Sequence, residues 1–366
     1  MDRHRRARNE TAAAYADFPV DVAADKREAD ALALQVARGI DADIFVTERP
    51  YLYQVKLGQM PIRLLRPREA VAIVGLYLRS QGVYSVFRNN DINFSMGRNV
   101  YFTVGAVELL PAIWRWSGAC AQESQASDSG TLSELAGSLI QRAQRALEAR
   151  DELHRVLNRA QNNETRTRVL SNLDIVLLLL MAASDITARV AHYALRLGDE
   201  YYEAGWQRSG WVKKVKKQDK NLAALVSEGA EGFHVMAVLS ALRNSIHAEV
   251  LQSLLVRDLS APPLTLFNLP IAQLSKLARM IDSLGGQTAW GLREARSGEL
   301  HADPGVFVDQ LFARMLDLLN AVMDCTPVER FPNVKGRLPG SPPTSDNALD
   351  RFSQTSRNSI RWQLGF

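Results

Sequence analysis

The chain has 366 residues, of which 46% are hydrophobic, so it is long enough for two domains and a sizeable core. Lys and Arg number 44 against 40 Asp and Glu, and this net charge of +4 is too small by itself to indicate a polyanionic partner. The only two cysteines, Cys120 and Cys325, lie far apart, which excludes a disulfide framework and zinc-binding spacings and fits a reducing compartment.

No membrane or secretory segment is expected from the sequence. Residues 1–8 are charged, and the apolar run of a secretory signal does not follow them. The most apolar stretch, Ile175–Ala183, is shorter than a bilayer span and is better explained as part of a buried helix. We therefore expect a cytoplasmic protein without membrane association.

The N-terminal part indicates a small α/β domain behind a basic arm. Residues 1–20 carry several arginines and little apolar pattern, which is typical of a flexible terminus. From residue 21 to 116, helical and strand-like patterns alternate. The expected elements are a helix at 25–39, strands at 43–47 and 60–65, and helices at 69–80 and 100–116.

Residues 117–130 are predicted to be a linker. Their sequence, SGACAQESQASDSG, has no apolar periodicity and is rich in Ser, Gly and Ala. We therefore place a domain boundary there, between the small α/β domain and the part that follows.

Residues 131–331 read as a helical domain, and the fold class is expected to be mainly α. Thr131 and Glu134 have the spacing of a capping box before a helix that reaches about Asn158. Asn163 is a plausible cap for a second long helix ending at Gly198, and the short joint between the two predicts an antiparallel pair.

The rest of this domain is predicted to be helices separated by loops. A long helix is expected over Ala230–Leu255, followed by a loop that contains Pro262, Pro263 and Pro270. Helices at Ile271–Leu284 and Val306–Met323 come next, the latter started by Asp303 and Pro304. Residues 332–366 are expected to be a loosely ordered tail.

The helix at Ala230–Leu255 is the most informative stretch of the chain. Arg243 and His247 are four residues apart and project from one face beside an apolar stripe, with Asn244 adjacent. The members of the stripe recur at three- and four-residue steps: Val235, Val238, Leu239, Leu242, Ile246, Val250 and Leu254.

The segment Leu242–Glu249, LRNSIHAE, resembles the signature of the HEPN superfamily, in which an Arg and a polar residue precede a His on a helix. The Arg-to-His spacing is shorter here than is usual in that family. The resemblance implies a HEPN-like helical bundle, metal-independent cleavage of RNA, a role in toxin–antitoxin or phage-defence systems, and a homodimer. It also implies that Arg243, Asn244 and His247 are catalytic, that no cofactor is used, and that an antitoxin or regulatory protein can be a partner.

The three residue types suit that chemistry. Cleavage of RNA without a metal needs a base for the ribose 2′-hydroxyl, and the ordinary pKa of histidine, near 6.5, is suited to it. Arginine offers a planar fork of donors to the phosphate as negative charge grows on it.

A non-catalytic helical module, for RNA binding or protein interaction, remains the alternative. The same Arg-polar-x-x-His spacing occurs at Arg150 and His154, where a highly charged stretch suggests solvated surface. A pattern present twice in one chain is a weak signal.

The stretch from Asp30 to Arg49 is similar to part of a PIN nuclease domain, in which an Asp opens a helix and the following strand ends in Val-Thr and a metal-binding acid. Asp30 and Glu48 match those acids, while Arg49 stands where many PIN domains have the second acid. The resemblance implies an incomplete PIN-like module with at most weak metal candidates, since two-metal chemistry needs a cluster of carboxylates.

A basic and aromatic cluster precedes the long helix. Lysines neutralise phosphates and indole rings stack on bases, so the cluster is a candidate RNA-binding surface, with a solvated loop as the alternative. His192 and His234 are expected to be core histidines. The members of the cluster are Trp206, Trp211, Lys213, Lys214, Lys216, Lys217 and Lys220.

Overall fold

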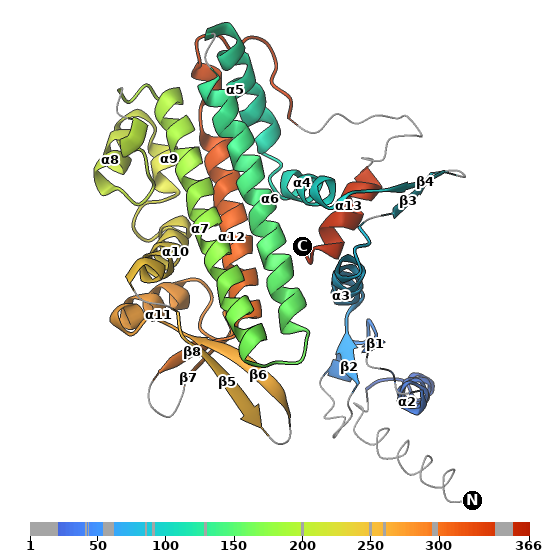
Figure 1. The fold of residues 1–366 in the computed structure, drawn as a ribbon. Coiled ribbons are helices and arrows are strands. Elements are labelled where there is room, and N and C mark those ends of the chain that lie inside the picture. Colours follow the sequence, from blue (N-terminus) through green and yellow to red (C-terminus); the bar gives the residue numbers. More distant parts are fainter. Residues whose placement is uncertain are drawn as a thin grey trace, which may run out of the picture. The chain divides into compact units, whose positions relative to one another are not determined.

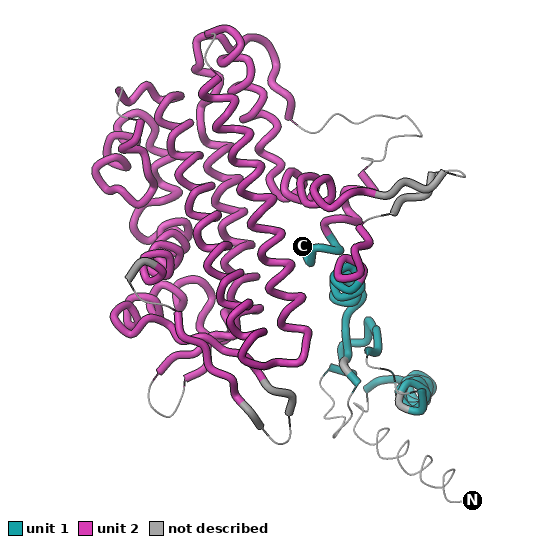
Figure 2. Tube along the Cα trace, in the orientation of Figure 1, with its two compact units in different colours: residues 1–77, 362–366 teal, residues 78–361 magenta. Residues whose placement is uncertain are grey.

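A computed structural model of the chain is mainly α-helical, as expected (Figure 1). It divides into two compact units, residues 1–77 with 362–366 (unit 1) and residues 78–361 (unit 2) (Figure 2). The structure describes residues 21–40, 42, 44–53, 62–84, 86–89, 92–127, 130–198, 201–248, 251–258, 261–294, 299–340 and 354–366. The predicted arm at residues 1–20 lies outside the described residues.

Unit 1 follows the expected order of helix, strand, strand and helix. It contains α2 (Ala24–Gly39), β1 (Ile44–Val46), the 3-10 turn η1 (Pro50–Tyr53), β2 (Arg63–Leu65) and most of α3 (Pro67–Ser80). The two short strands are parallel, with Phe45 opposite Leu64. The core of this unit is small, and its buried residues are Ala31, Leu34 and Leu52.

The segment after α3 differs from the prediction. Strands β3 (Val86–Asn89) and β4 (Ile92–Ser95) form a hairpin, and two helices follow, α4 (Arg98–Leu109) and α5 (Ile113–Ser127). The single helix predicted at 100–116 is thus broken near Pro111, which cannot continue a helix hydrogen-bond ladder.

The predicted linker at 117–130 is helical as far as Ser127. Within it, Ala119, Cys120 and Ser124 are buried. These small side chains give no pattern of large apolar residues, so the sequence does not predict a helix there.

Three long helices form the centre of unit 2: α6 (Thr131–Leu157), α7 (Asn163–Ala194) and α12 (Pro304–Cys325) (Figure 1). The antiparallel pair of α6 and α7 agrees with the prediction. The N-cap of each helix lies one residue before the predicted position. Gly130 precedes α6 and makes no side-chain cap, whereas Asn162 precedes α7 and forms a capping box with Thr165. Asp303 caps α12 as expected.

By length and composition, α7 could cross a membrane, a property shared by core helices of soluble proteins. Its buried side packs on α6, α10 and α12, which is the arrangement of such a core helix. Ile175 and Leu178 on the same helix are exposed.

The helix predicted over Ala230–Leu255 is shorter in the structure. Helix α10 (Glu231–Ala248) is followed by strand β5 (Ser253–Asp258), so Leu254 belongs to a strand and is exposed. Two shorter helices precede α10, namely α8 (Ser209–Gln218) and α9 (Lys220–Ala224).

The predicted proline loop is in fact a strand. Strand β6 (Ala261–Asn268) pairs with β5, and the sheet continues with β8 (Leu300–Ala302) and β7 (Leu292–Glu294). Pro262 and Pro263 fall at a bulge, where the missing N–H groups break no regular pairing. Helix α11 (Leu274–Ser283) corresponds to the helix predicted at 271–284, whose first residues form the 3-10 turn η3 (Ile271–Gln273).

The predicted loose tail contains a helix. Residues 332–340 have no regular structure, but α13 (Gln354–Gln363) buries Ile360 and Arg357. The Arg357 guanidinium pairs with Glu108 of α4, with 3.2 Å between Nε and Oε1.

Candidate functional site

Helix α10 presents Arg243 and Asn244 beside a buried stripe. Val235, Val238 and Leu239 of that stripe are completely or almost completely buried, as the periodicity predicted. Arg243 is half-buried and donates from Nη1 to Oδ1 of the exposed Asn244 at 3.2 Å. His247 lies in the helical backbone of α10, but its side chain lies outside the described residues.

Asp185 of α7 faces this region and is surrounded by positive charge. Burial raises the pKa of its half-buried carboxyl above the ordinary value. Four arginines lie close enough for their charges to oppose that rise, in decreasing order Arg189, Arg243, Arg208 and Arg142. Within the described part of the chain none of them forms an ion pair with Asp185.

These arginines come from different parts of the chain. Arg142 lies on α6, Arg189 on α7, Arg208 just before α8, and Arg243 on α10. The Nε of Arg142 is buried and has no hydrogen-bond partner among the described residues. Sequence reasoning missed Arg142 and Arg208, because only the fold brings them to Asp185.

Hydrogen bonds fix the segment that carries Arg208. Ser240 of α10 donates to Oε1 of Gln207 at 2.9 Å, and Gln207 in turn contacts the sulfur of Met181 on α7. Arg208 donates from Nη1 to the carbonyl oxygen of Tyr202 at 3.0 Å. The segment is therefore held between α7 and α10, beside Arg243.

The two tryptophans of the basic and aromatic cluster do not lie on the surface. Trp206 and Trp211 are 4% and 3% exposed, and their ring centroids are 4.8 Å apart. The Trp206 indole donates to Oγ1 of Thr187 at 3.0 Å. The expectation that they stack on bases is therefore wrong for this fold, because their rings and N–H groups are used inside the chain.

The lysines of the same cluster are exposed. Lys214 pairs with Glu203, with 2.9 Å between Nζ and Oε2. The others are exposed on or next to α8, and they remain candidates for contact with a polyanion: Lys213, Lys216, Lys217 and Lys220.

The second copy of the Arg-polar-x-x-His pattern has a structural role. Arg150 is buried, not solvated as the sequence suggested, and its Nε donates to Oδ1 of Asp309 at 2.7 Å. His154 Nε2 lies 2.8 Å from the same oxygen. Desolvation of this partly exposed carboxylate acts to raise its pKa, but the charges of Arg150 and His154 lower the pKa of Asp309 to about 2. The side chains of Arg150 and His154 are therefore both bound to the Asp309 carboxylate.

His192 and His234 are placed inside the helical unit. His192 is 1% exposed, accepts from the Trp211 indole at Nδ1 over 3.2 Å, and lies 2.8 Å from the Gly198 carbonyl oxygen through Nε2. This pattern requires a neutral ring that carries its proton on Nε2. His234 is half-buried, and its Nδ1 lies 3.0 Å from the sulfur of Met280.

The two PIN-like acids are not brought together in the described part of unit 1. Asp30 is buried and pairs with Arg49, with 2.7 Å between Oδ2 and Nε, and it also accepts from the Tyr51 hydroxyl. Glu48 is exposed. No group of three or more metal-ligating side chains occurs among the residues that the structure describes.

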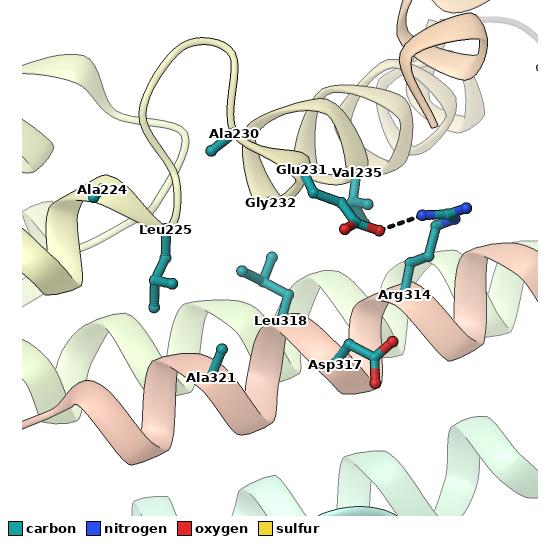
Figure 3. A pocket seen from close by; sticks show the side chains of 10 residues that line it. All are labelled: Ala224, Leu225, Ala230, Glu231, Gly232, Val235, Arg314, Asp317, Leu318 and Ala321. Carbon is teal, nitrogen blue, oxygen red and sulfur yellow. Dashed lines mark hydrogen bonds and ion pairs between the residues drawn. The ribbon is translucent and has the colours of Figure 1, made fainter. Parts of the chain in front are cut away.

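A cavity of about 340 Å³ lies at the other end of α10 (Figure 3). Gly232 and Leu318 lie on its walls, and an ion pair between Glu231 and Arg314 lies along one side. Arg243 lies about three helical turns away, at 1.5 Å per residue, and is not part of its wall.

Comparison of the chain with protein-family models, with curated proteins and with solved structures finds no match.

Proposed function

We propose that the chain is a cytoplasmic, RNA-directed protein that cleaves RNA without a metal, in the manner of a HEPN-like ribonuclease. One observation carries the proposal. Arg243 is half-buried in a group of arginines, and among the described residues its only hydrogen bond is to Asn244, whereas Arg150 and His154 are both occupied by Asp309. A guanidinium that forms no ion pair with a described residue suits the binding of a phosphate.

The proposed reaction uses the three residues of α10. His247 takes the proton from a ribose 2′-hydroxyl, whose oxygen then bonds to the adjacent phosphorus. The bond from phosphorus to the 5′-oxygen breaks, and the leaving oxygen takes a proton from water, which leaves a 2′,3′-cyclic phosphate and a new 5′-hydroxyl. His247 then returns its proton to the solvent. Arg243 stabilises the charge on the phosphate, and Asn244 orients the Arg243 guanidinium through their hydrogen bond.

The resemblance to the HEPN signature adds the biological setting to this proposal. It suggests a toxin or phage-defence effector that acts as a homodimer and is controlled by an antitoxin or another regulatory protein. The PIN-like segment takes no part in the proposed chemistry, because the Asp30 carboxylate is paired with Arg49.

Cleavage of total RNA in the presence of a chelator tests the proposal. We expect wild-type protein to cleave, and His247→Ala to lose activity by roughly 100-fold or more, the usual size of a general-base effect. His234→Ala, on the first turn of the same helix, is the matched control and should cleave like the wild type. Equal cleavage by His247→Ala would contradict the assignment, and RNA binding without cleavage would support the non-catalytic alternative.

A further inference from the structure

Four arginines lie around Asp185, and one carboxylate can neutralise only one of their charges. Arg142, Arg189 and Arg208 join Arg243 there, and no ion pair joins any of them to Asp185 within the described part of the chain. Four like charges that converge from three helices and a connecting segment repel one another, and one acid offsets only part of that cost. Such an arrangement is typical of a surface that binds an anion from outside the chain.

Arg142 supplies a second, independent observation. Its Nε is buried, and no described residue accepts a hydrogen bond from it. Buried donors in native proteins are nearly always satisfied, so this Nε is available to an acceptor from water or from a bound ligand. The donor lies on α6, in the group of arginines that also contains Arg243 of α10.

We propose that Arg142, Arg189 and Arg208 form a subsite that binds phosphates of the RNA backbone next to the one held by Arg243. Arginine is suited to this ligand because its planar fork of donors matches a phosphodiester. The subsite rests on the proposed RNA-directed function, but it concerns binding and does not require cleavage.

Asp185 has a specific part in this subsite. Its negative charge offsets part of the repulsion among the arginines when RNA is absent, and it weakens their attraction for incoming phosphates. Removing its charge while keeping its shape should therefore strengthen the binding of RNA.

Binding of a labelled 2′-O-methyl oligouridylate of about 20 nucleotides tests the subsite, measured by fluorescence anisotropy over a range of salt concentrations. The methyl groups block attack by the 2′-oxygen, so a failure of the catalytic proposal would leave this measurement intact. Each phosphate contact to a single strand contributes about 0.7 to the slope of log affinity against log salt. We expect Arg142→Gln and Arg208→Gln each to lower the slope by about that amount and the affinity by about threefold to tenfold.

Two further variants complete the experiment. Arg279→Gln, on the exposed side of α11, is the control and should leave the slope unchanged. Asp185→Asn should raise the affinity by about threefold or more. Because Arg142 is partly buried and its variant can unfold, the exposed Arg208 keeps the test valid.

Three results would overturn the subsite. They are no binding by the wild type, unchanged slopes in the arginine variants, and weaker binding by Asp185→Asn. Displacement of the RNA by a polyglutamate peptide that binds more tightly would instead assign the surface to an acidic protein partner.

Discussion

At the scale of single residues, one acid decides what the same sequence pattern does. Arg150 and His154 have the same spacing as Arg243 and His247, yet both contact Asp309, which lies 155 residues beyond His154. Arg243 has no such acid among the described residues. A local pattern therefore cannot separate a structural pair from a candidate site, because the deciding residue comes from a distant helix.

The Asp309 carboxylate gives a pH-dependent prediction. Its pKa is lowered to about 2, so it stabilises the folded state above its ordinary pKa near 4 and stops doing so as pH falls through 2. Because the side chain is 41% exposed, solvent screens the interaction, and we expect a contribution of about 1 kcal/mol. Thermal unfolding between pH 2 and 5 should show this loss in the wild type and a smaller one in Asp309→Asn.

At neutral pH, Asp309→Asn should also unfold more easily, by about 2 kcal/mol, because the buried Arg150 loses its counter-charge. Glu203→Gln removes an exposed ion pair and is the matched control, with an expected effect below about 1 kcal/mol. Equal losses in the two variants would contradict the structural role of Asp309.

The two tryptophans show that a cluster of residue types in the sequence does not by itself predict which of them are exposed. A cluster of indoles and lysines predicts a surface for nucleic acid, but Trp206 and Trp211 are buried and donate to Thr187 and His192. The lysines stay exposed, so the charge part of the prediction remains open while the stacking part is wrong. Composition identifies residue types, whereas burial depends on which helix covers them.

At the scale of elements, the start of α10 depends on a close contact at Gly232. A Cβ atom built there would lie 2.3 Å from the carbonyl oxygen of Leu225 and 2.6 Å from Cδ1 of Leu318. Gly232→Ala should therefore lower the free energy of unfolding by about 2 kcal/mol or more, since backbone has to shift. Urea denaturation measures the change.

Gly137 on α6 is the matched control for Gly232. It is exposed in mid-helix, and a Cβ there meets nothing within 4 Å, so Gly137→Ala should raise the free energy of unfolding by about 0.5–1 kcal/mol. If Gly232→Ala lowers the free energy of unfolding and Gly137→Ala raises it, the loss at Gly232 comes from its close contact and not from the replacement of a helical glycine as such. Stabilisation by both substitutions would contradict the close approach of α10 to Leu225.

The helices with strong periodicity were predictable, and the elements that depend on tertiary contacts were not. The pair α6 and α7 follows from apolar spacing and a short joint, and β1 follows from a β-branched and aromatic run. The end of α10 and strand β6 do not, because β6 tolerates Pro262 and Pro263 only through a bulge against β5. The second half of α5 could not be predicted, because only small residues such as Ala119 and Cys120 are buried there.

At the scale of the molecule, the candidate site is assembled within unit 2 from segments that are distant in sequence. Arg142, Arg208 and Arg243 come from α6, the segment before α8, and α10, and only their packing around α7 brings them to Asp185. Sequence patterns could identify Arg243 and Asn244, because those residues share one helix. The remaining arginines could not be found, since no local spacing connects them.

The proposed homodimer leads to a prediction about mixed proteins. If each site combines Arg243 of one protomer with His247 of its partner, a dimer of Arg243→Ala with His247→Ala contains one site with both substitutions and one intact site. We expect each variant alone to be inactive. After the two are unfolded and refolded together in equal amounts, about a quarter of wild-type cleavage should return, because half of the dimers are mixed and each of those has one of two sites.

The control for the mixing experiment is Arg243→Ala refolded with a double variant that carries both Arg243→Ala and His247→Ala. Every dimer in that mixture lacks Arg243 in both protomers, so no activity should return. Recovery from the first mixture and none from the second assigns the site to two protomers. No recovery from either, with wild-type protein cleaving normally, would place Arg243 and His247 in one protomer, as their spacing of one turn on α10 also allows.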